Sequence, residues 1–447
     1  MGNAESVSVG VLSLHNSKES KAILNAVDAL GHEGLWMRRE NSSVDVADGR
    51  LRVEPDVDVV LNRLLLSNTE HSCELLGLAN TFARALPMCN PPQATLTAFH
   101  KFATAAALVD ADIRVPDALL ALDAETLNAA RARFGEEAVY KTAIGTHGGG
   151  TWKVGRDERI NPMVGDRFAF LQEMIEWADD RNRDMRVYVV DGEILGAMYR
   201  YAPDNDWRTN VHLGGDVEAV EEVPAEAARF AREATETLGL DYAGVDLVEG
   251  TDGWYVLEVN PTAGFRGLFR ATGTSPAPYI AKLGIERAGG EVEEAAVEEL
   301  AADLDDSRPS GAPVVQSAEP TEPSEVGYTE EVLVSGTGGS ERVVAKSDTG
   351  AARTSIDTKL AASIGAGPIR SMTKVRSGSV RSGKSRPVVD IVVGIGGDRH
   401  TVAASLADRS HMEYPLLLGR DILEHYRVDV QRRFEERAEG GDREEEE

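Results

Sequence analysis

The sequence has few cysteines and no apolar run long enough to cross a membrane. Its two cysteines, Cys73 and Cys89, form no CxxC pair and cannot build a disulfide framework, which favours a reducing compartment. No stretch reaches the roughly 18 apolar residues of a membrane helix. The first residues, MGNAESVSVG, lack the pattern of a signal peptide. We therefore expect a cytoplasmic protein that does not work in a membrane.

Positive charge is also scarce. The 47 Lys and Arg residues are outnumbered by 75 Asp and Glu residues, and the formal net charge is −28 at pH 7. A chain this acidic is repelled by a phosphate backbone, which argues against nucleic acid as its partner. Acidic surfaces also keep proteins soluble in concentrated salt, so the composition indicates a halophilic source.

The chain of 447 residues is long enough for about three folding units. Strand-like and helical patterns alternate up to about residue 285, beginning with VSVGVL and KAILNAVDALG, which predict a βαβ start. In this region the pair Asp191-Gly192 is a turn signal and predicts a hairpin. An acidic helix and a Pro/Ser/Glu-rich linker follow over 286–326. An all-β pattern covers 327–433, and the acidic tail 434–447 has too few apolar residues to fold.

One strand pair in the first region carries three side chains suited to a metal ion. Glu258 and Asn260 are two residues apart in a strand and therefore share a face. A hairpin that turns around Asp252 and Gly253 would bring Asp246 roughly opposite Glu258, with the Cβ atoms about 5 Å apart. Mg²⁺ could occupy the space between the carboxylates. A solvated polar face of an exposed hairpin remains an equal alternative on the residues alone.

A glycine-rich loop, GTHGGGTWK at 145–153, could close over phosphates, although it lacks the GK[ST] of a Walker A motif. Lys141 precedes this loop and Lys101 lies on an earlier helix, and each could contribute a point charge. A hairpin turn and two surface lysines are the alternative interpretation.

The order of these features resembles a known family. The strings VYK, GTHGGG, LQEMI, DMRVYVVDGEILGAM, RTNVHLGG, AGVDL and LEVNPTAGF are similar to those of ATP-grasp ligases of the ribosomal-protein-S6 glutamate ligase (RimK) type. The resemblance implies an α/β (α+β) ATP-grasp fold, with a pre-ATP-grasp subdomain at 1–95 and the ligase domain at 96–285. It also implies ATP, two Mg²⁺ or Mn²⁺ ions, a glutamate donor and a carboxylate-bearing acceptor.

The same resemblance implies a role for each site residue. In this reading Lys101 and Lys141 hold phosphates, Glu173 and Met174 bind adenine, and Asp184 lies at the ribose. Arg208, Thr209 and Asn210 line the phosphate and acyl site, with Arg186 and Arg200 near the reacting carboxylate. Asp246, Glu258 and Asn260 are the metal ligands, and Arg200 and Arg208 are the catalytic cations.

Two positions depart from the family pattern. His100-Lys101 stands where Asp-Lys is usual, and Arg266 replaces an acidic residue in the loop NPTAGFRGLF. Because that loop helps receive the acceptor, the second departure puts glutamate as the substrate in question but leaves ATP use intact.

The all-β region contains Asp348-Thr349-Gly350, the motif with which aspartic proteases present their catalytic carboxylate. The strings DTGA, RPVVD and LADRSHMEYPLLLGRDIL resemble a family once described as ATP-dependent zinc proteases and now viewed as retropepsin-like. This resemblance implies a catalytic Asp348. We reject zinc because the sequence has no HExxH, and His400 and His411 are not at ligand spacing.

One DTG supplies half of a catalytic pair, because water activation requires two carboxylates that share a proton. Two chains must therefore meet on a two-fold axis, which predicts a homodimer through this region. The alternatives are a DTG domain that only dimerises the ligase or binds its product, and a nucleotide-binding regulatory protein without ligation.

A basic run, RSMTKVRSGSVRSGKSR at 370–386, has six basic residues and no acidic one. It lies where retropepsins place their flap, and a basic flap would suit an acidic peptide such as an oligoglutamate tail. Arg376, Arg381, Lys384 and Arg386 are the candidate contacts. A mobile surface loop is an equal alternative.

Overall fold

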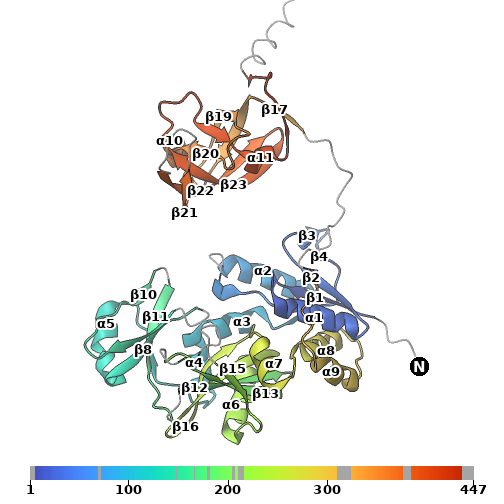
Figure 1. Ribbon diagram of the computed structural model, residues 1–447, viewed down its shortest axis with the longest axis vertical. Coiled ribbons are helices and arrows are strands. Elements are labelled where there is room, and N and C mark those ends of the chain that lie inside the picture. The colour runs from blue at the N-terminus through green and yellow to red at the C-terminus, as the bar shows by residue number, and fades with distance from the viewer. Residues whose placement is uncertain are drawn as a thin grey trace, which may run out of the picture. The chain divides into compact units, whose positions relative to one another are not determined.

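The computed structural model describes residues 6–68, 72–145, 150–165, 167–178, 182–203, 207–209, 216–309, 324–375 and 384–434. The chain divides into two compact units, 1–315 and 316–447 (Figure 1). Residues 310–323 and 435–447, which the sequence assigns to the linker and the tail, lie outside the described residues. No helix in the described ranges is both long and apolar enough to cross a membrane.

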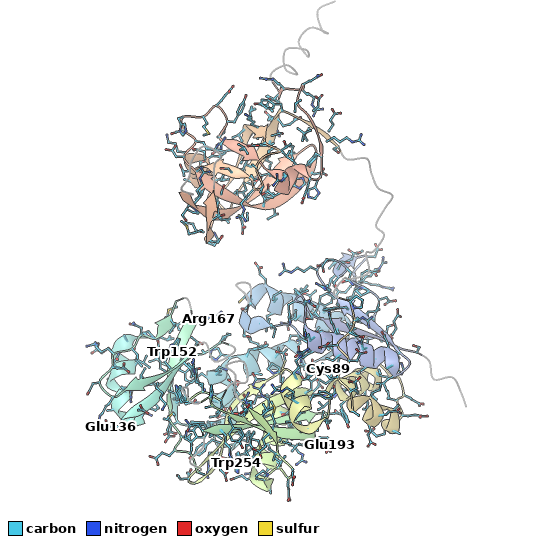
Figure 2. The ribbon with its side chains drawn as sticks, in the orientation of Figure 1. Cys89, Glu136, Trp152, Arg167, Glu193 and Trp254 are labelled. Carbon is cyan, nitrogen blue, oxygen red and sulfur yellow. The ribbon has the colours of Figure 1, made fainter. Side chains whose placement is uncertain are left out.

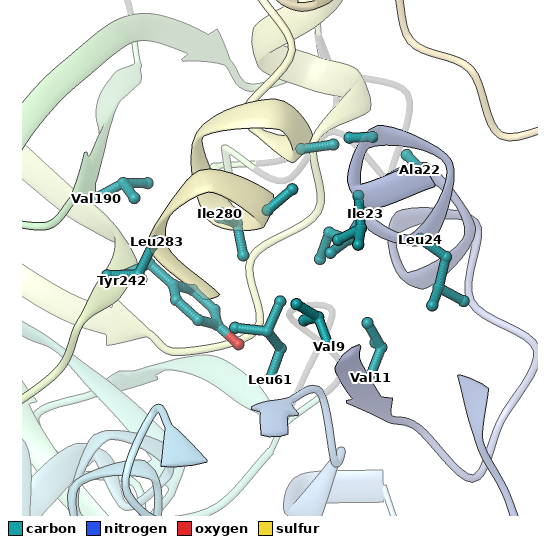
Figure 3. Packing of buried hydrophobic residues seen from close by; sticks show 14 of the residues in the cluster. Val9, Val11, Ala22, Ile23, Leu24, Leu61, Val190, Tyr242, Ile280 and Leu283 are labelled. Atoms are coloured by element: carbon teal, nitrogen blue, oxygen red, sulfur yellow. The ribbon is translucent and has the colours of Figure 1, made fainter. Parts of the chain in front are cut away.

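The first unit begins with a parallel sheet. Its strand order is β2 (Glu33–Met37), β1 (Ser8–Leu12), β5 (Val59–Asn62), β6 (Met88–Cys89). The strands are apolar on both faces, as expected for a covered parallel sheet. Helix α1 (Lys18–Ala29) packs beside α8 (Ala277–Arg287), and Ile23 and Ile280 meet the strand residues Val9 and Leu61 in a buried hydrophobic core (Figure 3).

The other elements in this part of the unit are the hairpin β3 (Ser43–Ala47) and β4 (Arg50–Glu54), and the helices α2 (Ser72–Ala85), α3 (Pro92–Phe99) and α9 (Glu294–Ala301). Helices α4 (Lys101–Asp110) and α7 (Arg266–Thr272) pack against the antiparallel sheet described below. Helix α4 begins at Lys101, a residue of the candidate site described below.

A second sheet forms a separate lobe of this unit. Its order is β10 (Met163–Val164), β11 (Arg167–Glu173), β8 (Glu137–Thr142), β9 (Thr151–Gly155), with β7 (Ala118–Leu119) paired to β11 and α5 (Ala124–Ala129) nearby. Trp152 and Arg167 label this lobe in Figure 2.

The third sheet is antiparallel. Its order is β14 (Val217–Ala219), β13 (Glu193–Tyr201), β12 (Arg183–Val190), β15 (Tyr242–Gly250), β16 (Gly253–Asn260), covered by α6 (Ala225–Thr237). The hairpin predicted at Asp191-Gly192 is confirmed. Both residues have positive φ, 49° and 78°, as the two-residue turn of a twisted hairpin requires.

The pairing of β15 with β16 contains an irregularity that matters for the site. Gly250 pairs with Gly253, so the turn is Thr251-Asp252 and the predicted turn, one residue later, is wrong. A bulge at Leu257 then shifts the register, and Asp246 lies opposite Glu258, as predicted. Without the extra residue, Asp246 would face Leu257 and Glu258 would point to the other side of the sheet.

The second unit is a small closed barrel. Its seven strands follow the order β18 (Thr329–Ser335), β19 (Ser340–Ser347), β24 (Leu416–Leu418), β20 (Ser355–Asp357), β23 (Asp398–Ala407), β22 (Lys384–Ile395), β21 (Ile369–Val375). Pairing of β18 with β22 closes the sheet, and β17 (Glu325–Gly327) pairs with β25 (Arg427–Asp429). Two short helices, α10 (Thr358–Ser363) and α11 (Arg420–Leu423), accompany the strands. The predicted fold class is confirmed for both units.

Candidate functional site

Three oxygen-bearing side chains gather on one face of β15 and β16. The Asn260 amide nitrogen lies 3.3 Å from Asp246 Oδ2 and 3.2 Å from Glu258 Oε1. Carboxylate and amide oxygens are hard ligands, and two carboxylates suit an Mg²⁺ ion that also binds phosphate oxygens. The donor set therefore fits the ion that the resemblance implies. Within the described ranges, no three His, Cys, Asp or Glu residues group into a further metal site.

Protein cations neutralise this face. Lys101 forms an ion pair with Glu258, and Arg186 donates two hydrogen bonds to Asp246, at 2.5 and 2.7 Å. Burial alone would raise the pKa of Glu258, but Lys101, Lys141 and Arg186 more than offset it and hold the pKa well below its usual range. Each carboxylate is thus paired with a cation that an incoming metal ion could release.

A second buried carboxylate extends the network. Arg200 donates to both oxygens of Asp184, at 2.7 and 2.5 Å, and also lies 2.9 Å from Asp246. Burial and the neighbouring Arg186 would lower the pKa of Arg200, but Asp184 and Asp246 raise it above its ordinary value. Thr209 adds a hydrogen bond of 2.5 Å to Asp184. The Asp184 carboxylate is therefore fully engaged, and its contact with a ribose stays a prediction.

Lys101 is positioned by the start of α4. Its backbone nitrogen donates to the carbonyl of Ala143 at 2.8 Å. The Nδ1 atom of His100 accepts a hydrogen bond of 3.1 Å from the nitrogen of Ala103, which caps the helix. An aspartate would cap the helix in the same way, so the His100 departure retains the local geometry.

Lys141 lies on β8 in the second sheet and is 6% exposed. Its ammonium lies 5.4 Å from the ring centroid of Phe170, the cross-strand neighbour on β11. Burial, together with the charge of Lys101, lowers the pKa of Lys141 to about 7, although Glu258 and Asp246 act in the opposite direction. An anionic ligand beside Lys141 would therefore stabilise the protonated form of this lysine.

The remaining predicted residues lie at the end of β11, next to Thr209, or outside the described ranges. Glu173 ends β11, where its carboxylate accepts from the nitrogen of Asp117 at 3.3 Å, and Met174 follows it half-buried. Arg208 is half-buried beside Thr209, whereas Asn210 and loop residues 146–149 lie outside the described residues. Gly145 and Gly150 border that loop. A Cβ atom added to Gly145 would lie 2.6 Å from the Thr142 hydroxyl oxygen, and one added to Gly150 would lie 2.4 Å from it.

In the second unit, Asp348 follows β19 directly, and its backbone nitrogen donates to Leu418 on β24 at 2.9 Å. Its carboxylate accepts a hydrogen bond of 3.0 Å from the nitrogen of Gly350. The loop that follows Asp348 is also held by Asp421. The Asp421 carboxylate accepts hydrogen bonds of 2.8–3.0 Å from the backbone nitrogen and the hydroxyl of Thr354. Sequence reasoning missed these two supports, although the GRD of YPLLLGRDIL marks one of them.

The basic run forms a hairpin. Strand β21 pairs with β22, and Thr373 lies opposite Arg386. The hairpin tip, 376–383, with Arg376 and Arg381, lies outside the described residues, as does the side chain of Lys384. His400 contacts His425 and Tyr426 rather than His411.

Comparison with family models matches 98–283 to the RimK-like ATP-grasp domain and 361–439 to the retropepsin-like aspartic endopeptidase RimB. The second match begins after Asp348. A tetrahydromethanopterin:α-L-glutamate ligase from Methanocaldococcus jannaschii is 36% identical over 198 residues, which cover 42% of this chain and 66% of the relative. The chain thus spans slightly less than two thirds of that relative.

A probable α-L-glutamate ligase of Haemophilus influenzae is 30% identical over 232 residues, or 50% of this chain and 74% of the relative. Among solved structures, the ATP-grasp ligase PsnB, complexed with a phosphomimetic variant of its minimal precursor, Mg and ADP, has a TM-score of 0.51 at 22% identity. That match covers 64% of this chain and 100% of the other, and it shows a shared fold.

Proposed function

The chain belongs to the RimK-like ATP-grasp family, and on that premise we propose that its first unit is a carboxylate–amine ligase. Both resemblances inferred from the sequence are confirmed at the level of family. ATP-grasp ligases use ATP and Mg²⁺. One observation carries the proposal: Asp246, Glu258 and Asn260 lie together on one face of β15 and β16. On that face, basic side chains form ion pairs with both carboxylates.

In the proposed reaction, a substrate carboxylate oxygen bonds to the γ-phosphorus of ATP, and ADP leaves. The amine nitrogen of the second substrate then bonds to the acyl carbon, and inorganic phosphate leaves. Bound Mg²⁺, held by the two carboxylates and the amide, would neutralise phosphate charge. Lys101, Lys141 and Arg186 would lessen the repulsion between the two anionic reactants and orient them. The reaction requires no protein nucleophile.

We further propose glutamate as the amino acid added and a carboxylate-bearing acceptor. The names of the glutamate ligases above support this choice. Arg266, which replaces an acidic residue of the acceptor loop, pairs with Asp306 at 2.6 Å, so its charge is already matched within the chain. We also propose nucleotide-binding roles for six residues: Glu173, Met174, Asp184, Arg208, Thr209 and Asn210. The proposal further includes a cytoplasmic location and a salt-rich environment for this protein.

The test is ADP release by the full chain with Mg-ATP, glutamate and candidate acceptor peptides, with mass spectrometry of the products. We expect ADP release that depends on both substrates and mass increments of one glutamate residue. Glu258→Gln should abolish both, whereas Glu249→Gln, an exposed change on the neighbouring strand, should not. Nucleotide binding without turnover would instead favour a regulatory protein.

For the second unit, we propose an aspartic-type peptidase that trims the product and works as a homodimer through this unit. The family match at 361–439 and the position of Asp348 at the end of β19 support it. With one such aspartate per chain, a shared-proton pair requires two chains. Cleavage of glutamate-extended peptides by the wild type, lost in Asp348→Asn, is the test. Dimers that bind the product without cleaving it would favour a non-catalytic module.

We propose the boundaries 1–95, 96–285, 286–326, 327–433 and 434–447 for the pre-ATP-grasp subdomain, the ligase domain, the acidic helix with its linker, the retropepsin-like domain and the tail. Separately expressed fragments cut at these points, tested for cooperative unfolding, would check them.

A further inference from the structure

The acceptor loop, residues 261–264, directly follows the proposed metal ligand Asn260, and buried side chains hold each of its four backbone carbonyls. The amide nitrogen of Asn90 donates to the first carbonyl at 3.2 Å, and Nη2 of Arg63 donates to the second and the third at 3.3 Å each. The hydroxyl of Tyr188 donates to the fourth. The backbone of this loop therefore cannot shift without breaking several hydrogen bonds.

Two of these donors belong to the pre-ATP-grasp subdomain. Arg63 directly follows β5 and Asn90 directly follows β6, so both lie at the carboxyl ends of neighbouring parallel strands. The side-chain oxygen of Asn90 also accepts hydrogen bonds from the nitrogens of Asp241 and Tyr242, at 2.6 and 3.0 Å, where β15 begins. The subdomain thus binds both the start of β15 and the loop after β16, the two strands of the proposed metal face.

The hydrogen bonding of Arg63 differs from that of a buried arginine that only stabilises the fold. Arg131, which is 2% exposed, donates from all three guanidinium nitrogens to four backbone carbonyls at 2.5–3.1 Å. Arg63 is 4% exposed, yet its Nε and Nη1 atoms are buried and have no hydrogen-bond partner in the described part of the chain. Buried donors without partners cost free energy, so stability alone does not account for an arginine at this position.

Packing between the layers does not account for this arginine either. Tyr242, Phe265 and Ile280 belong to one hydrophobic cluster that already joins the parallel sheet, α8 and the antiparallel sheet. The guanidinium carbon of Arg63 lies 5.3 Å from the ring centroid of Phe265. Two hydrogen bonds and this cation–π contact all end within residues 262–265, so the guanidinium acts on the loop.

We propose that Arg63, Asn90 and Tyr188 are positioning residues of the ligase, which hold the acceptor loop in the conformation that receives the acceptor. The amide of Asn260 makes its own hydrogen bonds to the two carboxylates of the metal face, so a loosened loop should weaken acceptor binding and leave ATP binding unchanged. This inference rests on the proposed ligase function and deepens it, because it assigns part of acceptor binding to the pre-ATP-grasp subdomain.

Steady-state kinetics of the full chain test the role in acceptor binding. ADP release is measured with Mg-ATP, glutamate and candidate acceptor peptides. We expect Arg63→Met to raise the KM for the acceptor at least tenfold and to change the KM for ATP less than twofold. Arg63→Lys should recover part of the loss, because an ammonium can donate to the same carbonyls. Arg131→Lys is the control: it removes donors from a buried arginine elsewhere and should lower the Tm without raising the KM for the acceptor.

Hydrogen exchange examines the loop without any turnover. Amide exchange is followed over residues 261–273, which include α7, where the nitrogen of Phe269 donates to the carbonyl of Phe265 at 3.0 Å. Arg63→Met and Tyr188→Phe should each make this segment exchange at least threefold faster, with β15 and β16 unchanged. Tyr188→Phe removes a single hydroxyl, so it keeps the test valid if Arg63→Met does not fold.

The inference is overturned if exchange in this segment is unchanged in both variants, or if the segment exchanges faster while the KM for the acceptor stays the same. A wild type that releases no ADP with any acceptor would instead overturn the proposed ligase function. The exchange rates would then still decide whether the three side chains hold the loop.

Discussion

The carboxylates of the two units lie in opposite electrostatic surroundings. Asp246 is 2% exposed and contacts two arginines, and Glu258 pairs with a lysine. Asp348 is half-buried and makes no ion pair within the described ranges, and its carboxylate accepts one backbone hydrogen bond. The proposed metal site takes all its side chains from one chain, whereas the proposed peptidase site would require a second carboxylate from another chain.

This difference follows from what each site must do. A site for Mg²⁺ and phosphates needs ionised carboxylates and fixed cations before its ligands arrive, so one chain supplies both. A carboxylate pair that shares a proton needs the opposite, two acidic groups near one another with little positive charge between them. The proposed two-fold axis would supply the second acidic group without a second motif in the sequence.

The most severe test removes a carboxylate from the first unit. We expect Asp246→Ala and Glu258→Ala each to lower ATP turnover at least a hundredfold, because the proposed metal face loses a ligand. Asp246→Ala should also lower the free energy of unfolding by about 3–5 kcal/mol, because it leaves Arg186 and Arg200 buried with one carboxylate fewer. Urea unfolding and ADP release measure the two effects.

Glu258→Ala should be less destabilising, because its side chain is 26% exposed and its partner Lys101 can reach solvent. Equal stability losses in the two variants would show that burial does not distinguish the two ligands. Full turnover in the double variant would remove the metal assignment.

A mixing experiment tests whether the proposed peptidase site of the second unit needs an aspartate from each of two chains. Wild-type chains and Asp348→Asn chains are mixed in equal amounts, allowed to exchange and assayed for peptide cleavage. If each site needs an aspartate from both chains, about a quarter of the fully wild-type activity should remain. Half of the activity would indicate that each chain works alone and would remove the contrast between the units.

The pH dependence of nucleotide binding tests the cations of the first unit. Because the pKa of Lys141 is lowered to about 7 and phosphates favour its protonated form, ATP affinity should fall as pH rises above 7, by up to about tenfold per unit. Lys141→Arg stays charged and should flatten this dependence. Titration calorimetry between pH 6 and 9 measures it.

The lowered pKa of Lys141 also predicts how stability changes with pH, and this trend is opposite to that of the ATP affinity. The folded state binds fewer protons than the unfolded state between pH 7 and 10.5, so the contribution of Lys141 to the free energy of unfolding should rise with pH there. A Lys141→Met variant, which cannot titrate, should lack this rise. Identical pH profiles for the wild type and Lys141→Met would contradict the shifted pKa.

Sequence patterns predicted the fold class, the Asp191-Gly192 hairpin and the pairing of Asp246 with Glu258. They did not predict the bulge at Leu257 that produces this pairing from a turn at Thr251-Asp252. A signal was present, because Trp254 and Val256 alternate but the next buried residue is Val259, one position late. Such a shift is missed when regular alternation is assumed. It is found only when the positions of the apolar residues are followed along the whole strand.

Contacts between distant segments were less accessible to sequence reasoning. Lys101 was assigned to phosphate, and nothing local indicates that it also pairs with Glu258, 157 residues away. Arg409 likewise looks like any arginine in a loop, yet it is only 8% exposed, and its backbone nitrogen donates to Asp357 at the end of β20. Sequence periodicity reports which face a residue occupies, but the distance between faces of different elements is set by packing.

The smallest expected effect concerns the start of α4, where this chain has His100 instead of the usual aspartate. Since the His100 ring caps the nitrogen of Ala103, His100→Ala should lower the free energy of unfolding by about 1 kcal/mol. His100→Asp should lose almost nothing, because a carboxylate can accept the same bond. Both variants keep Lys101, so a rise in the KM for ATP in His100→Ala alone would show that the cap also positions the lysine. If His100→Asp were as destabilised as His100→Ala, the ring would be acting through packing, and the departure from the family pattern would then require a different explanation. Urea unfolding of the three proteins, with ATP kinetics on each, separates these outcomes.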